Sequence, residues 1–130
     1  MNQFDKVKEY LANLEYTILS EDATEELVIV EKSDAGITNL LIDCEDPILV
    51  IEYPLLKLKD APSGILNELL VKNRDIIHGA FAIAEDNFLI FRDTLQLENL
   101  DENELEGTLN SLELLLAEYG HRLIEISKNN

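Results

Sequence analysis

The sequence lacks features that several large classes of protein require. Its single cysteine, Cys44, rules out an internal disulfide. The longest apolar stretches, 48–51 and 79–84, are too short to cross a membrane. The five glycines are scattered and form neither a G-x-G-x-x-G nor a G-K-[ST] loop, so we expect no phosphate-binding loop. There is no tryptophan to serve as a sugar-stacking platform.

Basic residues are also scarce, with 10 against 27 acidic ones and a formal net charge of −17. The negative electrostatic field of a chain with this net charge repels phosphate backbones and anionic membranes. We therefore expect no nucleic acid and no membrane among the partners. Apolar residues make up 46% of the chain, too many for a disordered protein. The first eight residues include Phe4 and Asp5 and lack the apolar core of a signal peptide. With one cysteine, this pattern predicts a cytoplasmic protein.

The 130 residues have the size of one domain, which we expect to span 1–130. Helical spacing of Phe4, Val7, Leu11 and Leu14 predicts a first helix over 2–14. A second helix is expected from Ser63, the candidate N-cap, with its inner face extending to Ile77. Runs rich in β-branched and aromatic residues predict strands over 27–32, 37–44, 48–53, 80–84 and 88–92. Residues 20–26 are polar and acidic, which indicates a loop.

The last helix has the clearest pattern. Asp101 and Glu104 have the spacing of a capping box. Apolar residues then alternate steps of four and three, which predicts one continuous seam: Leu105, Leu109, Leu112, Leu116, Tyr119, Leu123 and Ile126. Short loops between the strands favour antiparallel pairing. The predicted fold class is α+β, an antiparallel sheet of about five strands packed with three helices in the order α-βββ-α-ββ-α.

Two of the predicted strands, at 27–32 and 48–53, are apolar on both faces. In the strand at 48–53, Ile48 and Val50 lie on one face while Leu49, Ile51 and Tyr53 lie on the other. Strands of this kind require cover on both sides. Two arrangements would supply it. Either the three helices divide between the faces, or a second copy or a partner segment covers what the helices leave open.

The residues that commonly carry chemistry do not form a catalytic or metal-binding pattern. His78 and His121 have no H-x-x-x-H or H-E-x-x-H neighbour. Cys44 is surrounded by acidic residues, whereas a reactive cysteine needs a basic environment. The acidic clusters at 43–46 and 101–104 do not follow a calcium-loop pattern. We therefore predict no catalytic residue, no metal site, no cofactor and no enzyme activity.

Residues 67–112 carry a family resemblance. The run contains, in order, a helix end followed by a small-residue strand, an acidic hairpin turn, a strand that ends in arginine, and a helix cap. These features lie at His78-Gly79-Ala80-Phe81, Glu85-Asp86, Leu89-Ile90-Phe91-Arg92 and Leu100 to Leu105. This run resembles the YbjN-like family, whose members share the fold of type III secretion chaperones such as the Tir chaperone. The resemblance implies a compact fold of the secretion-chaperone type, often dimeric, and names no catalytic group.

These observations favour a non-enzymatic, chaperone-like protein-binding module that holds a segment of a client protein on apolar sheet surface. Candidate contacts are Leu49, Ile51, Tyr53, Phe81 and Ile83. The alternative is a regulatory or sensory adaptor that acts through a folded protein partner, because other YbjN-like proteins are described as sensory or regulatory. An unrecognised enzyme and a small-molecule carrier remain further alternatives. A homodimer is also expected as a possible assembly.

Overall fold

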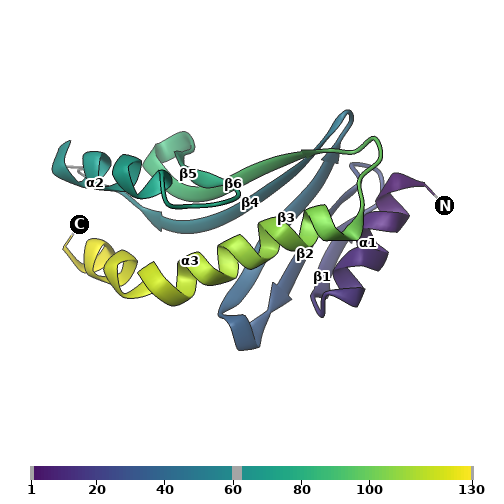
Figure 1. The fold of residues 1–130 in the computed structure, drawn as a ribbon, viewed down its shortest axis with the longest axis horizontal. Coiled ribbons are helices and arrows are strands. Elements are labelled where there is room, and N and C mark those ends of the chain that lie inside the picture. Colours follow the sequence, from purple (N-terminus) through teal and green to yellow (C-terminus); the bar gives the residue numbers. More distant parts are fainter. Residues whose placement is uncertain (1, 60–62, 130) are drawn as a thin grey trace.

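The structure is a computed structural model that describes residues 2–59 and 63–129. Three helices pack against one sheet (Figure 1). The helices are α1 (Gln3–Asn13), α2 (Ser63–Asn73) and α3 (Glu102–Lys128). The strands are β1 (Thr17–Asp22), β2 (Leu27–Lys32), β3 (Ile37–Glu45), β4 (Ile48–Lys57), β5 (Ala80–Ile83) and β6 (Phe88–Gln96). The α+β class and the three helices are confirmed.

The sheet has six strands where about five were expected, in the order β1-β2-β3-β4-β6-β5, with every neighbouring pair antiparallel. The additional strand is β1, and it occupies part of the segment that was expected to be a loop. All six of its residues are exposed, so the alternation of apolar and polar residues that identifies a half-buried strand is absent. The element order is therefore α-ββββ-α-ββ-α.

Strand β4 does not end at Pro54 but continues to Lys57. Its ladder with β3 ends at Glu52, whereas its ladder with β6 continues past Pro54 after an irregularity in the register. Pro54 therefore lies where β4 has a neighbour on one side. A residue without a backbone donor is tolerated at such a position.

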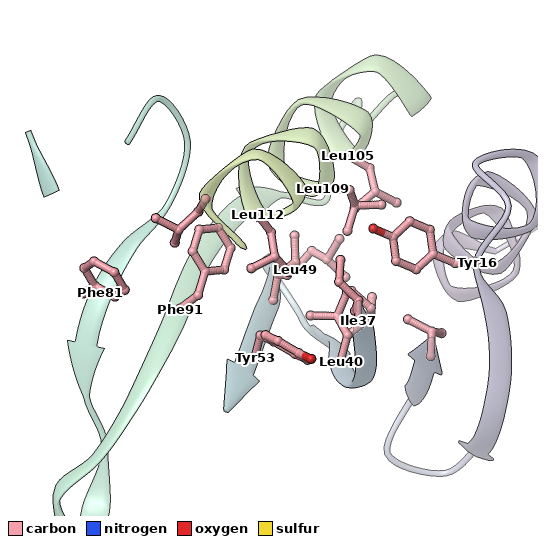
Figure 2. Close-up of a cluster of buried hydrophobic side chains, with 14 of the residues drawn as sticks. Tyr16, Ile37, Leu40, Leu49, Tyr53, Phe81, Phe91, Leu105, Leu109 and Leu112 are labelled. Atoms are coloured by element: carbon pink, nitrogen blue, oxygen red, sulfur yellow. The ribbon is translucent and has the colours of Figure 1, made fainter. Parts of the chain in front are cut away.

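The core lies between α3 and one face of the sheet. Leu105, Leu109 and Leu112 of α3 are fully buried against strand residues that include Leu49 and Phe91 (Figure 2). Helix α1 contributes Phe4, Val7 and Leu11 to the same cluster, and α2 contributes Leu69. Each fully buried leucine contributes about 2 kcal/mol to folding. The predicted seam of α3 is thus confirmed at five of its seven residues. Leu116 and Tyr119 are only partly buried, and Leu115, which was not predicted, is buried instead.

All three helices cover the same face of the sheet. The buried apolar side chains that stand outside the core cluster are Val50 and Ile90, and both point to the opposite face. In the described ranges no helix packs on that face. Of the two arrangements that the sequence left open, the helices do not divide between the faces.

Two of the helices begin at a side chain that caps the first turn. The Asp101 carboxylate accepts a hydrogen bond from the backbone N–H of Glu104 at 2.9 Å, which confirms the cap of α3. Asn2 caps α1 in the same way, through the N–H of Asp5 at 2.8 Å. Gly120 does not interrupt α3, which continues to Lys128.

Helix α2 is shorter than the pattern predicted, because it ends at Asn73. The Asn73 side chain accepts from the Phe81 N–H at 2.7 Å and donates to the Phe81 carbonyl at 3.2 Å, so it tethers the helix to β5. Ile77 lies beyond the helix and is 76% exposed, contrary to its predicted place on the inner face. The helix starts at Ser63, but the side chain of this candidate cap lies outside what the structure describes. Within 2–59 and 63–129, no helix combines the length and apolarity that a membrane span requires.

Two glycines with positive φ provide a matched test of the packing around Phe91. A Cβ at Gly79 (φ +81°) would overlap the ring of Phe91, whereas a Cβ at Gly36 (φ +76°) would meet nothing within 4 Å. Phe91 is fully buried and has no room to move. We expect Gly36→Ala to cost about 1 kcal/mol of unfolding free energy, from left-handed strain alone. Gly79→Ala should cost about 2 kcal/mol more, from the overlap with the ring.

Urea unfolding followed by circular dichroism measures both variants. Equal losses for the two alanines would contradict the predicted close packing of Gly79 on Phe91.

Candidate protein-binding surfaces

The five residues predicted as client contacts separate into two groups. Leu49 and Ile51 are fully buried beneath α3, so they belong to the chain's own core and do not reach the surface (Figure 2). Tyr53 and Phe81 are also buried in the core, at 8% and 7% exposed, but together with the exposed Ile83 they line two hollows at the surface. The alternating pattern of β4 shows which residues share a face but not which face the helices cover. The sequence could therefore not distinguish core from surface here.

The larger hollow is a groove of about 860 Å³ between α3, β4 and the turn that joins β2 to β3; we call it the α3 groove. Leu114 and Ile124 of α3 stand on its rim and are 49% and 54% exposed. Pro54 and Leu55 of β4 form the opposite wall. The groove follows α3 from residue 110 to 124, about 21 Å at 1.5 Å per residue.

The polar groups at one end of the α3 groove are already paired. The Tyr16 hydroxyl donates to the Glu113 carboxylate at 2.8 Å, and the Lys32 ammonium approaches the same oxygen at 3.4 Å. Burial, followed by the Glu113 carboxylate, raises the pKa of Tyr16. The Tyr53 hydroxyl donates to the Gly36 carbonyl at 3.3 Å and accepts from the Thr38 N–H at 3.1 Å. These hydrogen bonds fix the shape of the groove. Because its polar groups are already paired, the groove is suited to holding an apolar segment.

The second hollow, of about 300 Å³, lies between α2 and β5. Phe81 and Ile83 line it together with Leu66 and Leu70 of α2. Leu70 is 70% exposed and Ile83 is 47% exposed, and Val71 is exposed on the same helix. We call this region the α2–β5 surface. Leu66, Leu70 and Val71 of α2 are exposed, and among the described side chains of this helix only Leu69 is buried in the core. Exposed apolar side chains gathered in this way mark a protein-binding surface.

Helix α2 is attached to α3 by a network centred on Glu68. Both carboxylate oxygens accept hydrogen bonds from Arg122 at 2.7 Å, and the Tyr119 hydroxyl donates to the same group. Hydrogen bonds from Arg122 and then Tyr119 lower the pKa of Glu68 to about 2. The Lys72 ammonium lies over the Tyr119 ring, 5.3 Å from its centroid. The charges of Glu68 and Arg122, which lie beside the α2–β5 surface, therefore neutralise each other.

Strand β1 forms one edge of the sheet, and edge strands are sites where a peptide can add a strand. Two features of β1 oppose such pairing. The ladder with β2 is irregular between Ile18 and Ser20, and the strand ends in two acidic residues, Glu21 and Asp22. Irregular registers and charged side chains are common protections of an edge. The α3 groove is therefore the better candidate for an apolar client segment.

The sheet face opposite the helices carries two rows of cross-strand neighbours, which we call the open face. One row is Asp22, Leu27, Asp43, Val50 and Thr94. The other row is Ser20, Ile29, Leu41, Glu52 and Arg92. The face is thus a mixture of apolar and acidic side chains across five of the six strands, with one cation at its end.

Asp43 is the unusual group on the open face. Its direct neighbours across the strands are apolar, Leu27 on one side and Val50 on the other. Its Oδ1 is buried and has no hydrogen-bond partner. Burial, followed by the nearby Glu45 carboxyl, raises the pKa of Asp43 to about 6. A carboxylate held in this way destabilises the fold when it is ionised.

Groups suited to metal binding are not assembled in the part of the chain that the structure describes. No cluster of three or more histidine, cysteine, aspartate or glutamate side chains there could hold a metal ion. Burial raises the pKa of the Cys44 thiol to about 11, so it remains protonated and unreactive at neutral pH. The backbone of His78 bonds to the Ser111 hydroxyl through both its N–H and its carbonyl, which attaches the loop before β5 to α3.

Two of three comparisons with known proteins give a match, one to a protein family and one to solved structures. A family model, CesT_Tir_1, matches residues 1–129. No curated protein sequence matches the chain. The fold is similar to that of YbjN from E. coli, with a TM-score of 0.64, 12% identity and 92% of each chain covered. It is also similar to the Yersinia pestis type III secretion chaperone SycH bound to a fragment of YscM2 (TM-score 0.63, 15% identity, 97% and 100% covered). The ExsC–ExsE complex is similar too (0.63, 21%, 95% and 96%).

The pKa of Asp43 leads to a prediction about stability and pH. The folded chain binds this proton more tightly than the unfolded chain, in which the group titrates near its ordinary value of 3.8. Ionisation therefore costs stability as the pH rises through about 6, and the cost disappears below 3.8. We expect Asp43→Asn to be more stable than the wild type by about 1 kcal/mol at pH 7. This difference should vanish near pH 4.

Urea denaturation of both proteins from pH 4 to pH 8 measures the difference. A variant that is less stable than the wild type at pH 7 would show that Asp43 is stabilised in the fold, contrary to this prediction.

Proposed function

This chain belongs to the CesT_Tir_1 family of type III secretion chaperones, and from that premise we propose that it is a non-enzymatic, cytoplasmic chaperone that holds a segment of a client protein. The observation that carries the proposal is the α3 groove, a long apolar hollow with exposed leucine and isoleucine on its rim. Exposed apolar surface of this kind marks sites of protein binding. The client segment lies along α3, with Tyr53 at one end of the contact.

The similar structures support a protein as the partner. SycH is bound to a fragment of YscM2, and ExsC to ExsE. A further similar structure is the HopA1–SchA chaperone–effector complex, with a TM-score of 0.62 and 15% identity. The groove of about 860 Å³ is large enough for several apolar side chains. The length of about 21 Å corresponds to about six residues of an extended chain or four turns of helix.

We also propose that two copies of the chain associate through the α2–β5 surface. Leu66, Leu70 and Val71 on α2, with Ile83 at the sheet edge, would become buried in such a contact. A twofold contact places the same patch against itself, so any charge on the patch meets its own sign. Across most of a chain with net charge −17 this would be unfavourable. The α2–β5 surface avoids the problem, because Arg122 neutralises Glu68 beside it.

A pair of substitutions tests the client site. Ile124→Asp places a charge on the rim of the α3 groove, at a side chain that is already half exposed, so the fold should persist. Tagged wild type should retain one or two proteins from its own cell lysate at high salt, identified by mass spectrometry. Ile124→Asp should reduce this retention at least tenfold, because a buried, unpaired carboxylate costs more than 1.4 kcal/mol. Leu19→Asp, at an exposed leucine of β1 away from the groove, is the matched control and should retain the client.

Two results would contradict the client site. Equal retention by both variants would exclude the α3 groove, and the absence of any salt-resistant partner would remove the basis for the chaperone function. Limited proteolysis of the retained partner then distinguishes the two functions. A short protected segment in a disordered stretch supports the chaperone, whereas a compact folded partner favours the regulatory adaptor.

Light scattering with size-exclusion chromatography tests the dimer. The wild type should have twice the chain mass of 14.8 kDa, and Leu70→Asp should have the single-chain mass. Leu19→Asp, at an exposed leucine of β1 far along the sheet from α2, should leave the dimer intact. A monomeric wild type at 100 μM, or a dimeric Leu70→Asp, would exclude this interface.

A further inference from the structure

The open face is acidic and apolar at once, and this combination limits what can bind to it. Leu27, Ile29, Leu41 and Val50 supply apolar surface in the middle of the face. Carboxylates surround these residues: Asp43 among them, and Glu25, Glu45 and Glu52 close enough to Asp43 to affect its ionisation. An occupant of this face must therefore bring both apolar side chains and positive charge.

The chain's own cations near the face are already used. Arg92, the basic member of the two rows, donates to the Glu52 carboxylate at 2.8 Å. Asp22 accepts hydrogen bonds from the backbone N–H groups of Thr24 and Glu25, at 3.1 and 3.0 Å. Asp43 differs from Glu52 and Asp22, because its Oδ1 is buried without a hydrogen-bond donor. Asp43 is thus the carboxylate on this face that an external donor would stabilise most.

We propose that the open face is a second binding surface, and that it takes a short segment of another protein in which lysine or arginine alternates with apolar residues. Rotation of the Asp43 side chain brings its carboxylate to an incoming ammonium or guanidinium group. The apolar side chains of the segment then cover Leu27, Leu41 and Val50. A second copy of this chain does not fit, because the rows of Asp22, Asp43 and Glu52 would face their own charge.

This site is separate from the α3 groove, which lies on the side of the sheet that the helices cover. The inference goes beyond the proposed client site and can fail independently of it. It also explains why an aspartate occupies position 43 of the sheet. An aspartate that lowers stability in the free protein becomes favourable once a cation binds.

The experiment uses a nine-residue peptide of alternating valine and lysine with blocked ends, titrated into the ¹⁵N-labelled protein at pH 7.5 and 150 mM salt. Amide shifts should concentrate at Leu27, Leu41, Asp43 and Val50. Asp43→Asn should weaken binding about fivefold or more, by loss of a charge-assisted contact. Lowering the pH of the wild type to 5 should have the same effect, since Asp43 is then largely protonated.

Three controls make the outcome decisive. Glu9→Gln removes the same charge from an exposed position on α1, on the side that the helices cover, and should leave the affinity unchanged. Ile124→Asp in the α3 groove should also leave peptide binding intact. A peptide in which serine replaces valine should bind much more weakly. Equal affinity for wild type and Asp43→Asn, shifts confined to the α3 groove, or no binding at 1 mM peptide would each overturn the proposal.

Discussion

Three leucines of α3, at 105, 109 and 112, pack across the middle of the sheet, and the arrangement of everything else follows from that contact. A helix with its side chains is about 10 Å wide, whereas six strands at about 4.8 Å spacing span about 24 Å between the outer two. One helix therefore covers the centre only. Helices α1 and α2 must lie on either side of α3 to close the same face, and within 2–59 and 63–129 no helix is left for the opposite face.

This one-sided covering explains why apolar surface remains on so small a protein. Helix α3 is 27 residues long, about 40 Å, so its later turns extend past the part of the sheet that β1 to β3 provide. The α3 groove opens beside those turns. Helix α2 packs at the far edge of the sheet, on the short strand β5, and buries one of its sides there. The α3 groove and the α2–β5 surface are therefore places where a helix has less sheet to cover than it needs.

Much of the fold was predictable from the sequence, and the failures have identifiable causes. The seam and cap of α3 follow helical periodicity, which depends on local spacing alone. Strand β1 was missed because hydrogen bonding to β2, not burial, makes it a strand, and hydrogen bonding leaves no pattern in side-chain type. Among the candidate contacts, Leu49, Ile51, Tyr53 and Phe81 are all buried in the core cluster, and only Ile83 is exposed. Tyr53, Phe81 and Ile83 nevertheless line hollows.

The rim of the α3 groove was not predicted, although a signal for it existed. Leu114 and Ile124 lie on α3 but outside the seam, and apolar residues off the buried stripe of a long helix indicate an exposed apolar position. The opposite wall could not be found in this way. Pro54 and Leu55 are more than fifty residues from that part of α3, and their approach depends on how β4 extends beyond β3.

The attachment of Glu68 to Arg122 has a thermodynamic consequence for these two sites. Arg122 lies between Gly120 and Leu123, which line the α3 groove, while Glu68 belongs to the helix that carries the α2–β5 surface. A ligand that shifts α3 must strain this ion pair or move α2 with it. For the two proposed sites, the factor by which an occupied groove changes the affinity of self-association equals the factor by which self-association changes the affinity of the groove, because the two equilibria form one closed cycle. Measurements of client binding and of dimerisation would then report the same coupling free energy.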